Sequence, residues 1–348
     1  MDLRKIVNGA VKVALPLLLG GMILYWMYRD FDFKSIEHVL LNEMDWSWML
    51  LSFPFGVTAC VFRGWRWRQT LEPAGERPRF GTCVNSVFLS YAASLIVPRI
   101  GEFTRCGVLK RYDGVSFAKA LGTVVTERAI DSLVVLLVTG LTLLCQFRVF
   151  TTFFDETGTS LSAIAGRFSA TGYLVTAVCA VAALALLHVL LKKLYIYNKV
   201  KATLGGVWQG VVSLRHVRNI PLFLLLTLGI WGSYFLHYYL TFFCFPFTSS
   251  LGVACALVTF VVGSIAVIVP TPNGAGPWHF AVKTMLILYG LGETEALYFV
   301  LIVHTVQTML VVVLGVVAWA VLAFTKTTGG KEQACAQETV AGADTDGR

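Results

Sequence analysis

Charged residues are scarce in this chain of 348 residues. Asp, Glu, Lys and Arg make up 14% of it, hydrophobic residues make up 56%, and the mean hydropathy is +0.71. A soluble chain of this length cannot bury so much apolar surface, so the composition excludes an ordinary soluble globular protein. The chain is therefore expected to be an integral membrane protein.

Several chemical signatures are also missing. The eight cysteines include no Cys-x-x-Cys pair, so we expect neither a zinc site nor a disulfide framework. No nucleotide-binding loop is visible, which argues against ATP-driven pumping by this chain alone. No nucleophile motif supports an enzyme, and no nucleic-acid module accompanies the net charge of +8, which suits basic cytoplasmic loops and anionic lipid. We expect no cofactor, no metal and no nucleic-acid partner.

The apolar segments predict one all-α polytopic membrane domain over residues 1–324. The pattern gives about six full spans and two interrupted segments, with an amphipathic helix within residues 196–214 on the inner leaflet. The polar tail, residues 325–348, is predicted to be disordered and cytoplasmic. The six spans are predicted at residues 7–28, 46–62, 117–147, 173–191, 220–245 and 296–324.

Loop charges orient these spans. Residues 29–45 are acidic and suit the outer side, whereas the loop after residue 62 is basic and suits the cytoplasm, so both termini are predicted to be cytoplasmic. The run RGWRWR at residues 63–68 alternates Arg with Trp. We interpret it as an interfacial belt that grips lipid headgroups rather than as a nucleic-acid patch.

The first interrupted segment, residues 81–111, predicts a re-entrant helical hairpin. If residues 81–97 crossed the membrane fully, the basic stretch 99–119 would lie outside, against the positive-inside tendency. A break between Pro98 and Gly101 lets the chain return to the cytoplasm instead. Irregular backbone at membrane depth is tolerated only where it is buried in protein or lines a cavity, so the break indicates a site.

The second interrupted segment, residues 251–289, predicts a matching hairpin that enters from outside. Its break is PTPNGAGPW at residues 270–278, which cannot continue a helix. Pro98 and Pro272 lie 174 positions apart (272 − 98 = 174), half of the chain. Interrupted segments at matching positions predict inverted repeats with a substrate site near the midplane, where half-helix N-termini suit a phosphate.

Ionisable residues in the following span are costly at membrane depth and usually mark a pathway. Glu127 and Asp131 share a helix face, and Arg128 is within ion-pair reach of Asp131. They form either a structural ion pair or a group that couples protons or substrate. His304 and Gln307 lie one turn apart in the last span, and we expect them to hydrogen-bond between helices rather than to bind a metal.

Three short motifs carry a family resemblance. Pro98, Gly101, Glu102 and Arg105 form the first and Glu127, Arg128 and Asp131 the second; the third reads Pro270-x-Pro272-Asn273-Gly274-x-Gly276-x-x-His279. Together they resemble the transmembrane flippase-like region of lysylphosphatidylglycerol synthases and the stand-alone membrane proteins related to it. The family commonly has glycine where Asn273 stands and glutamate at His279, so His279 is either a pH-dependent switch or a plain hydrogen-bonding group.

The resemblance implies a bacterial inner-membrane flippase or transporter that binds an anionic phospholipid or a polyprenyl-phosphate lipid. About two dozen residues follow the last span, so we expect no aminoacyl-transfer domain in this chain. The residues expected to bind substrate are Arg99, Gly101, Glu102, Arg105, Pro272, Asn273, Gly274, Gly276 and His279, and those expected to provide coupling or buried charge are Glu127, Arg128 and Asp131.

Two alternatives stay open. The first is a membrane-embedded transferase or hydrolase on a lipid-linked substrate, with Glu127 or Asp131 as base and His279 as acid. The second is a non-transporting scaffold for a glycosyltransferase or another lipid enzyme.

Overall fold

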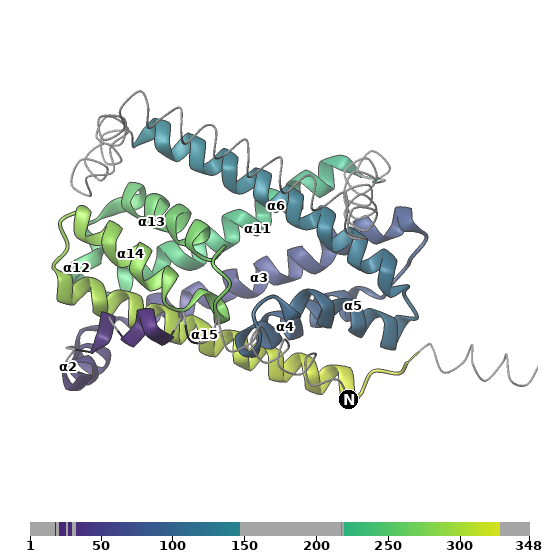
Figure 1. Ribbon diagram of the computed structural model, residues 1–348, viewed down its shortest axis with the longest axis horizontal. Helices are drawn as coiled ribbons and strands as arrows, with labels where there is room; N and C mark the ends of the chain where they lie inside the picture. Colours follow the sequence, from purple (N-terminus) through teal and green to yellow (C-terminus); the bar gives the residue numbers. More distant parts are fainter. Residues whose placement is uncertain are drawn as a thin grey trace, which may run out of the picture.

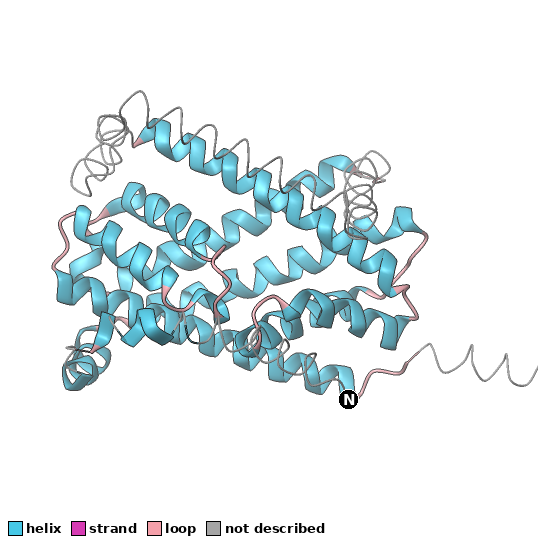
Figure 2. Ribbon diagram, viewed as in Figure 1, coloured by secondary structure: helices cyan, strands magenta, loops and turns pink. Residues whose placement is uncertain are grey.

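The computed structural model describes residues 18, 21–25, 27–29, 33–146, 217 and 219–327. The described part is helical and contains no strand (Figure 2). Three of its helices are long and apolar enough to cross a membrane: α6 (Phe117–Cys145), α11 with η4 (Ile220–Cys244) and α15 (Glu293–Ala323). The prediction of an all-α membrane protein is confirmed. The expected span at 173–191, the helix at 196–214 and residues 328–348 lie outside the described residues.

The remaining elements are mostly shorter. In chain order, the described elements are α2 (Phe33–His38), η1 (Val39–Glu43), α3 (Trp46–Leu71), η2 (Glu72–Ala74), α4 (Phe80–Ile96), α5 (Ile100–Asp113), α6, α11 (Ile220–Tyr239), η4 (Leu240–Cys244), α12 (Pro246–Ser249), α13 (Gly252–Ala266), η5 (Pro272–Gly274), α14 (Pro277–Leu288) and α15. Figure 1 shows α4 and α5 toward one end of the molecule and α13 and α14 toward the other, with α15 passing both pairs.

Helix α3 is longer than the sequence pattern predicted. It begins where the Asp45 carboxylate accepts a hydrogen bond of 2.9 Å from the Ser47 backbone N–H. It continues to Leu71, nine residues beyond the predicted end of the span at residue 62. The prediction that a loop begins at residue 63 is therefore wrong. The helix continues because Arg63 and Arg66 turn inward to carboxylates of another helix, which removes the cost of keeping them in an apolar segment.

Helices α4 and α5 form a hairpin at the first break. A Cβ added to Gly101 would lie 2.1 Å from the Ser90 carbonyl oxygen, so only glycine allows the backbone of α5 to approach α4 this closely. At the open end, the Arg79 backbone N–H and its Nε donate to the Asp113 carboxylate at 2.9 and 2.6 Å. The two ends of this hairpin therefore lie together.

Helices α13 and α14 form a second hairpin around the second break. A Cβ on Gly263 of α13 would lie 2.8 Å from Nε1 of Trp278 on α14, so these helices also pack closely. Between them, Gly274 and Gly276 adopt φ values of 73° and 92°, which glycine tolerates best. Glycine therefore stands at two positions of the break where the backbone has a positive φ.

Helix α15 links the open ends of the two hairpins. Near its C-terminal end the Lys326 carbonyl accepts a hydrogen bond from Arg79, which precedes α4. At its N-terminal end Glu293 forms an ion pair of 2.6 Å with Lys283 of α14. Because α15 has 31 residues, it is about 46 Å long at roughly 1.5 Å per residue. The two hairpins thus open toward opposite ends of α15.

Candidate functional site

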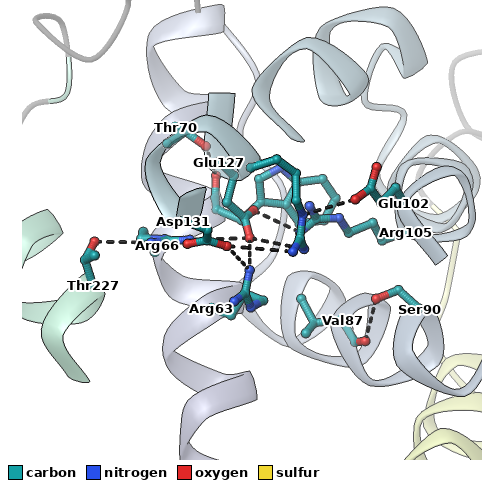
Figure 3. A network of polar contacts seen from close by, with 12 residues as sticks. Arg63, Arg66, Thr70, Val87, Ser90, Glu102, Arg105, Glu127, Asp131 and Thr227 are labelled. Atoms are coloured by element: carbon teal, nitrogen blue, oxygen red, sulfur yellow. Dashed lines mark hydrogen bonds and ion pairs between the residues drawn. The ribbon is translucent and has the colours of Figure 1, made fainter. Parts of the chain in front are cut away.

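A buried network of ion pairs joins α3, α5 and α6 (Figure 3). Nη1 of Arg63 lies 2.6 Å from Glu127 Oε1 and 2.7 Å from Asp131 Oδ2. Nη2 of Arg66 lies 2.7 Å from Asp131 Oδ1, and Nη1 of Arg105 lies 2.9 Å from Glu127 Oε2. Two carboxylates one turn apart on α6 therefore hold three arginines from two other helices.

The spacing of these residues explains the arrangement. Arg63 and Arg66 are three positions apart on α3, and Glu127 and Asp131 are four positions apart on α6, so each pair faces one way. Arg66 also donates from Nη1 to the Thr227 hydroxyl at 3.3 Å, which brings α11 into the network.

The network is almost closed to solvent. Arg63, Arg66 and Arg105 are 3%, 0% and 1% exposed, and Glu127 and Asp131 are 1% and 6% exposed. Three buried guanidinium groups thus face two buried carboxylates, which leaves an excess of positive charge. Nη2 of Arg105 has no hydrogen-bond partner within the described part of the chain.

Arg105 is held in place by its aromatic neighbour as well as by Glu127. Its guanidinium carbon lies 4.7 Å from the ring centroid of Trp67, which is fully buried. Trp67 is itself oriented by a hydrogen bond of 3.0 Å from its Nε1 to the Thr123 hydroxyl. Arg105 is therefore fixed with one of its donor groups unsatisfied.

A half-exposed ion pair lies at the edge of the network. Nε of Arg128 is 3.1 Å from Glu102 Oε1, and the two side chains are 42% and 34% exposed. Arg128 also lies 3.9 Å from Glu127 and 3.8 Å from Asp131. The Arg128–Glu102 pair is thus the part of the network that solvent or lipid reaches.

The two chain breaks touch each other. Nη2 of Arg99, in the first break, donates to the carbonyl of Ile268, just before the second break, at 3.0 Å. Arg99 and Asn273 have φ values of 63° and 51°, and no other non-glycine residue among those described has a positive φ. They are separated by the same 174 positions (273 − 99 = 174) as the prolines, so each break has a non-glycine residue of positive φ at the equivalent position of its half.

The second break carries a separate polar cluster. The Gly276 backbone N–H donates to Nδ1 of His279 at 3.4 Å, and the rings of His279 and His304 have centroids 4.4 Å apart. Nε2 of His304 lies 3.1 Å from the Asn273 carbonyl, and the Asn273 amide donates to the Thr308 hydroxyl at 2.7 Å. This cluster joins the break to α15.

The residues predicted to bind substrate and those predicted to provide coupling or buried charge form two clusters, and the rest lie in the two breaks. Glu102, Arg105, Glu127, Arg128 and Asp131 share the ion network. Asn273, Gly276 and His279 belong to the second cluster, Arg99 links the breaks, and Gly101 and Gly274 allow the turns. Pro272 begins η5. In the described residues no hydrogen bond or ion pair joins His279 to the ion network.

Arg63 and Arg66 were missed as site residues by the sequence interpretation. The prediction that the RGWRWR run lies as an interfacial belt is wrong for both arginines, because they are buried and paired with Glu127 and Asp131. A signal was present in the sequence. Two carboxylates within one helix turn need more counter-charge than Arg128 supplies, and the three-residue spacing of Arg63 and Arg66 offers it.

His304 and Gln307 do form bonds between elements, as predicted. His304 bonds to the Asn273 carbonyl, and Nε2 of Gln307 donates to the His237 carbonyl of α11 at 3.2 Å. Over the described ranges, no group of three or more His, Cys, Asp or Glu side chains is placed to hold a metal ion.

Comparison with protein-family models assigns the chain. The model described as the lysylphosphatidylglycerol synthase TM region matches residues 13–315. The chain belongs to this family. Neither the curated proteins nor the solved structures contain a match to it. As a member of the lysylphosphatidylglycerol synthase TM family, it is an integral membrane protein of the flippase-like kind, and the matched region includes both hairpins, the ion network and the second cluster.

Proposed function

We propose that this protein binds the anionic headgroup of a phospholipid or polyprenyl-phosphate lipid at the ion network and moves it between the two leaflets of the membrane. The observation that carries the proposal is the excess of buried guanidinium charge, three arginines against two carboxylates, together with the unsatisfied Nη2 of Arg105. Both lipid types present the same chemistry, a phosphate group, to this network.

The energetics of burial support an anionic ligand. A buried charge is costly unless it is paired and hydrogen-bonded, so a buried excess of guanidinium groups over carboxylates is rarely kept for stability alone. A phosphate supplies both the missing negative charge and several acceptor oxygens, and the planar guanidinium group matches it with two parallel hydrogen bonds. Arg105, fixed over Trp67, is oriented before the ligand arrives.

The half-exposed pair suggests how a headgroup reaches the network. A phosphate that displaces the Glu102 carboxylate from Arg128 replaces one anion by another, so Arg128 keeps a partner throughout. Arg128 is also close to both buried carboxylates, which places the ligand next to the network. When no lipid is bound, the Glu102 carboxylate occupies the position next to Arg128 that the phosphate takes in the bound state.

The fold offers a route for transfer between leaflets. The two hairpins open toward opposite ends of α15, and their breaks meet at the Arg99–Ile268 hydrogen bond. Rocking of two inverted halves about a central site is the usual way such folds alternate access. The location that goes with this proposal is the bacterial inner membrane, with both termini in the cytoplasm.

The proposal is tested with the purified full chain in vesicles of phosphatidylcholine that carry a fluorescent phosphatidylglycerol or a fluorescent polyprenyl phosphate. Movement between leaflets is followed by quenching from outside. We expect wild-type protein to move at least one of the two anionic probes and Arg128→Gln to move it at least about tenfold more slowly, the loss expected for one charge-assisted hydrogen bond of about 1.5–3 kcal/mol.

Arg111→Gln is the matched control, because Arg111 is an exposed arginine on the neighbouring helix α5 that lies outside the network. It should leave the rate unchanged. Wild-type protein that moves neither probe, or an Arg128→Gln protein as fast as the control, would contradict the proposal. Covalent change of a lipid-linked substrate in detergent would favour the enzyme alternative instead.

A further inference from the structure

A cavity lies away from the ion network. It has a volume of about 470 Å³ and lies between α14, α15 and a stretch that contributes Leu24, Tyr25, Tyr28 and Arg29. Its wall includes the apolar side chains of Leu24, Ala275 and Leu301 and the rings of His279 and His304. The volume falls within the range of small-molecule sites, and walls that are mostly apolar with a few polar groups are typical of them.

Backbone hydrogen bonds set the protonation pattern of the two histidines. The Gly276 N–H can only donate, so Nδ1 of His279 accepts and the proton of the neutral ring is on Nε2. The Asn273 carbonyl can only accept, so Nε2 of His304 donates and Nδ1 of the neutral ring keeps a lone pair. Within the described chain, no hydrogen bond occupies Nε2 of His279 or Nδ1 of His304.

The surroundings favour the neutral form of both rings. His279 is only 2% exposed, and with centroids 4.4 Å apart the two rings would repel each other if both were protonated. The other ionisable groups among the described residues that line this cavity are Tyr25, Tyr28 and Arg29. The two imidazoles therefore offer one donor, Nε2–H of His279, and one acceptor, Nδ1 of His304.

We propose that this cavity binds the uncharged, hydroxyl-bearing part of a lipid. A hydroxyl group is both a donor and an acceptor, so one hydroxyl can satisfy both free imidazole nitrogens. The lipid chain then runs along the apolar wall formed by Leu24 and Leu301. The one cation among the described residues of the wall, Arg29, is exposed, so this cavity differs from the ion network, where the arginines are buried.

His279, in the wall of this cavity, has an equivalent position in the first half of the chain. His279 follows Arg105 by 174 positions (279 − 105 = 174), the same interval that separates Arg99 from Asn273. Arg105 contacts Glu127 on the long helix that follows its hairpin, and the His279 ring contacts that of His304 on the long helix that follows the other. Equivalent positions in the two halves thus carry a charged group in one and a neutral group in the other. The inference is independent of the proposed transport of anions.

The test uses two uncharged probes that differ in a single hydroxyl group, 1,2-dioleoylglycerol and its 3-O-methyl ether. Each is titrated into the purified full chain in mild detergent, and bound lipid is counted by native mass spectrometry. We expect the wild-type protein to bind dioleoylglycerol about fivefold or more tightly than the ether, as expected for loss of a single neutral hydrogen bond.

His279→Leu and His304→Leu should each abolish this preference while the ether binds as before. The matched control is His38→Leu, the same change at a surface histidine of α2 whose side chain is 68% exposed, and it should keep the preference. Equal affinity of the wild-type protein for the two probes would overturn the proposal. So would a preference that survives both leucine changes.

Leu301→Trp is a second test of the same site, because it fills the cavity and leaves both histidines in the sequence. It should weaken binding of both probes. If a leucine variant at His279 or His304 fails to fold, this variant decides alone, and unchanged binding of both probes overturns the site. Because the probes carry no charge, this failure would leave the assay of anion movement unaffected.

Discussion

Glu127 is the residue on which most of the buried charge depends, because it contacts Arg63 and Arg105 directly and lies 3.5 Å from Arg66. Replacing it by glutamine leaves these guanidinium groups with one carboxylate, Asp131. Removing one partner of a buried ion pair costs about 3–5 kcal/mol. We expect Glu127→Gln to lower the thermal unfolding temperature of the purified protein by several degrees or more.

Glu102→Gln is the matched control for this prediction. Glu102 is a carboxylate of the same network, yet its side chain is 34% exposed and pairs only with the half-exposed Arg128. Exposed ion pairs contribute about 0–1 kcal/mol, so Glu102→Gln should shift unfolding little. Equal shifts in both variants would show that the buried network does not stabilise the fold in the way described.

At the scale of the element, the first hairpin depends on one close approach. A methyl group at Gly101 would overlap the Ser90 carbonyl oxygen and the Ser94 hydroxyl of α4. Both contacts are closer than atoms can approach, and a backbone carbonyl cannot move aside. We expect Gly101→Ala to force α4 and α5 apart, lowering the unfolding temperature and the rate of lipid movement together.

Gly107→Ala isolates this packing effect from helix propensity. Gly107 lies six residues further along the same helix, and a Cβ there meets nothing within 4 Å. Alanine is favoured over glycine inside a helix by about 0.5–1 kcal/mol, so this change should leave stability equal or slightly higher. A Gly101→Ala protein as stable as the Gly107→Ala protein would show that the hairpin tolerates a wider spacing.

At the scale of the whole molecule, the arrangement of the hairpins predicts their sidedness. The first opens near Lys326, at the C-terminal end of α15, and the second opens near Glu293, at its N-terminal end. In a background without the eight native cysteines, we expect Arg111→Cys to react with an impermeant maleimide from the side of the C-terminal tail. Glu293→Cys should react from the opposite side.

Sealed vesicles of both orientations provide the internal control, because each position should switch between reactive and protected when the orientation is reversed. Labelling of both cysteines from the same side would contradict hairpins that enter from opposite leaflets. It would also remove the basis for alternating access, since both breaks would then be reached from one aqueous phase.

Composition and local backbone chemistry account for the class of the molecule and for the places where its helices break. Hydropathy indicates a membrane protein because transfer of apolar segments into lipid depends on composition alone. Pro98 and residues 270–278 break their helices because proline and glycine act through the local backbone, and the structure has a turn at each. The motifs around Gly101, Glu127 and Gly274 also carried the family resemblance that the family comparison confirmed.

Which charged groups meet depends on how α3, α5 and α6 pack against one another. Arg63 and Glu127 are 64 positions apart. The spacing of Arg63 and Arg66 places both on one face of α3, but only the packing of the helices shows that this face meets α6 and not lipid headgroups. The separation of the predicted site into an ion network and a histidine cavity likewise depends on which helices pack together, and so does the contact of Tyr28 with His279. Periodicity along a chain reports which face of a helix is polar, whereas the partner of that face is set by packing between segments far apart in sequence.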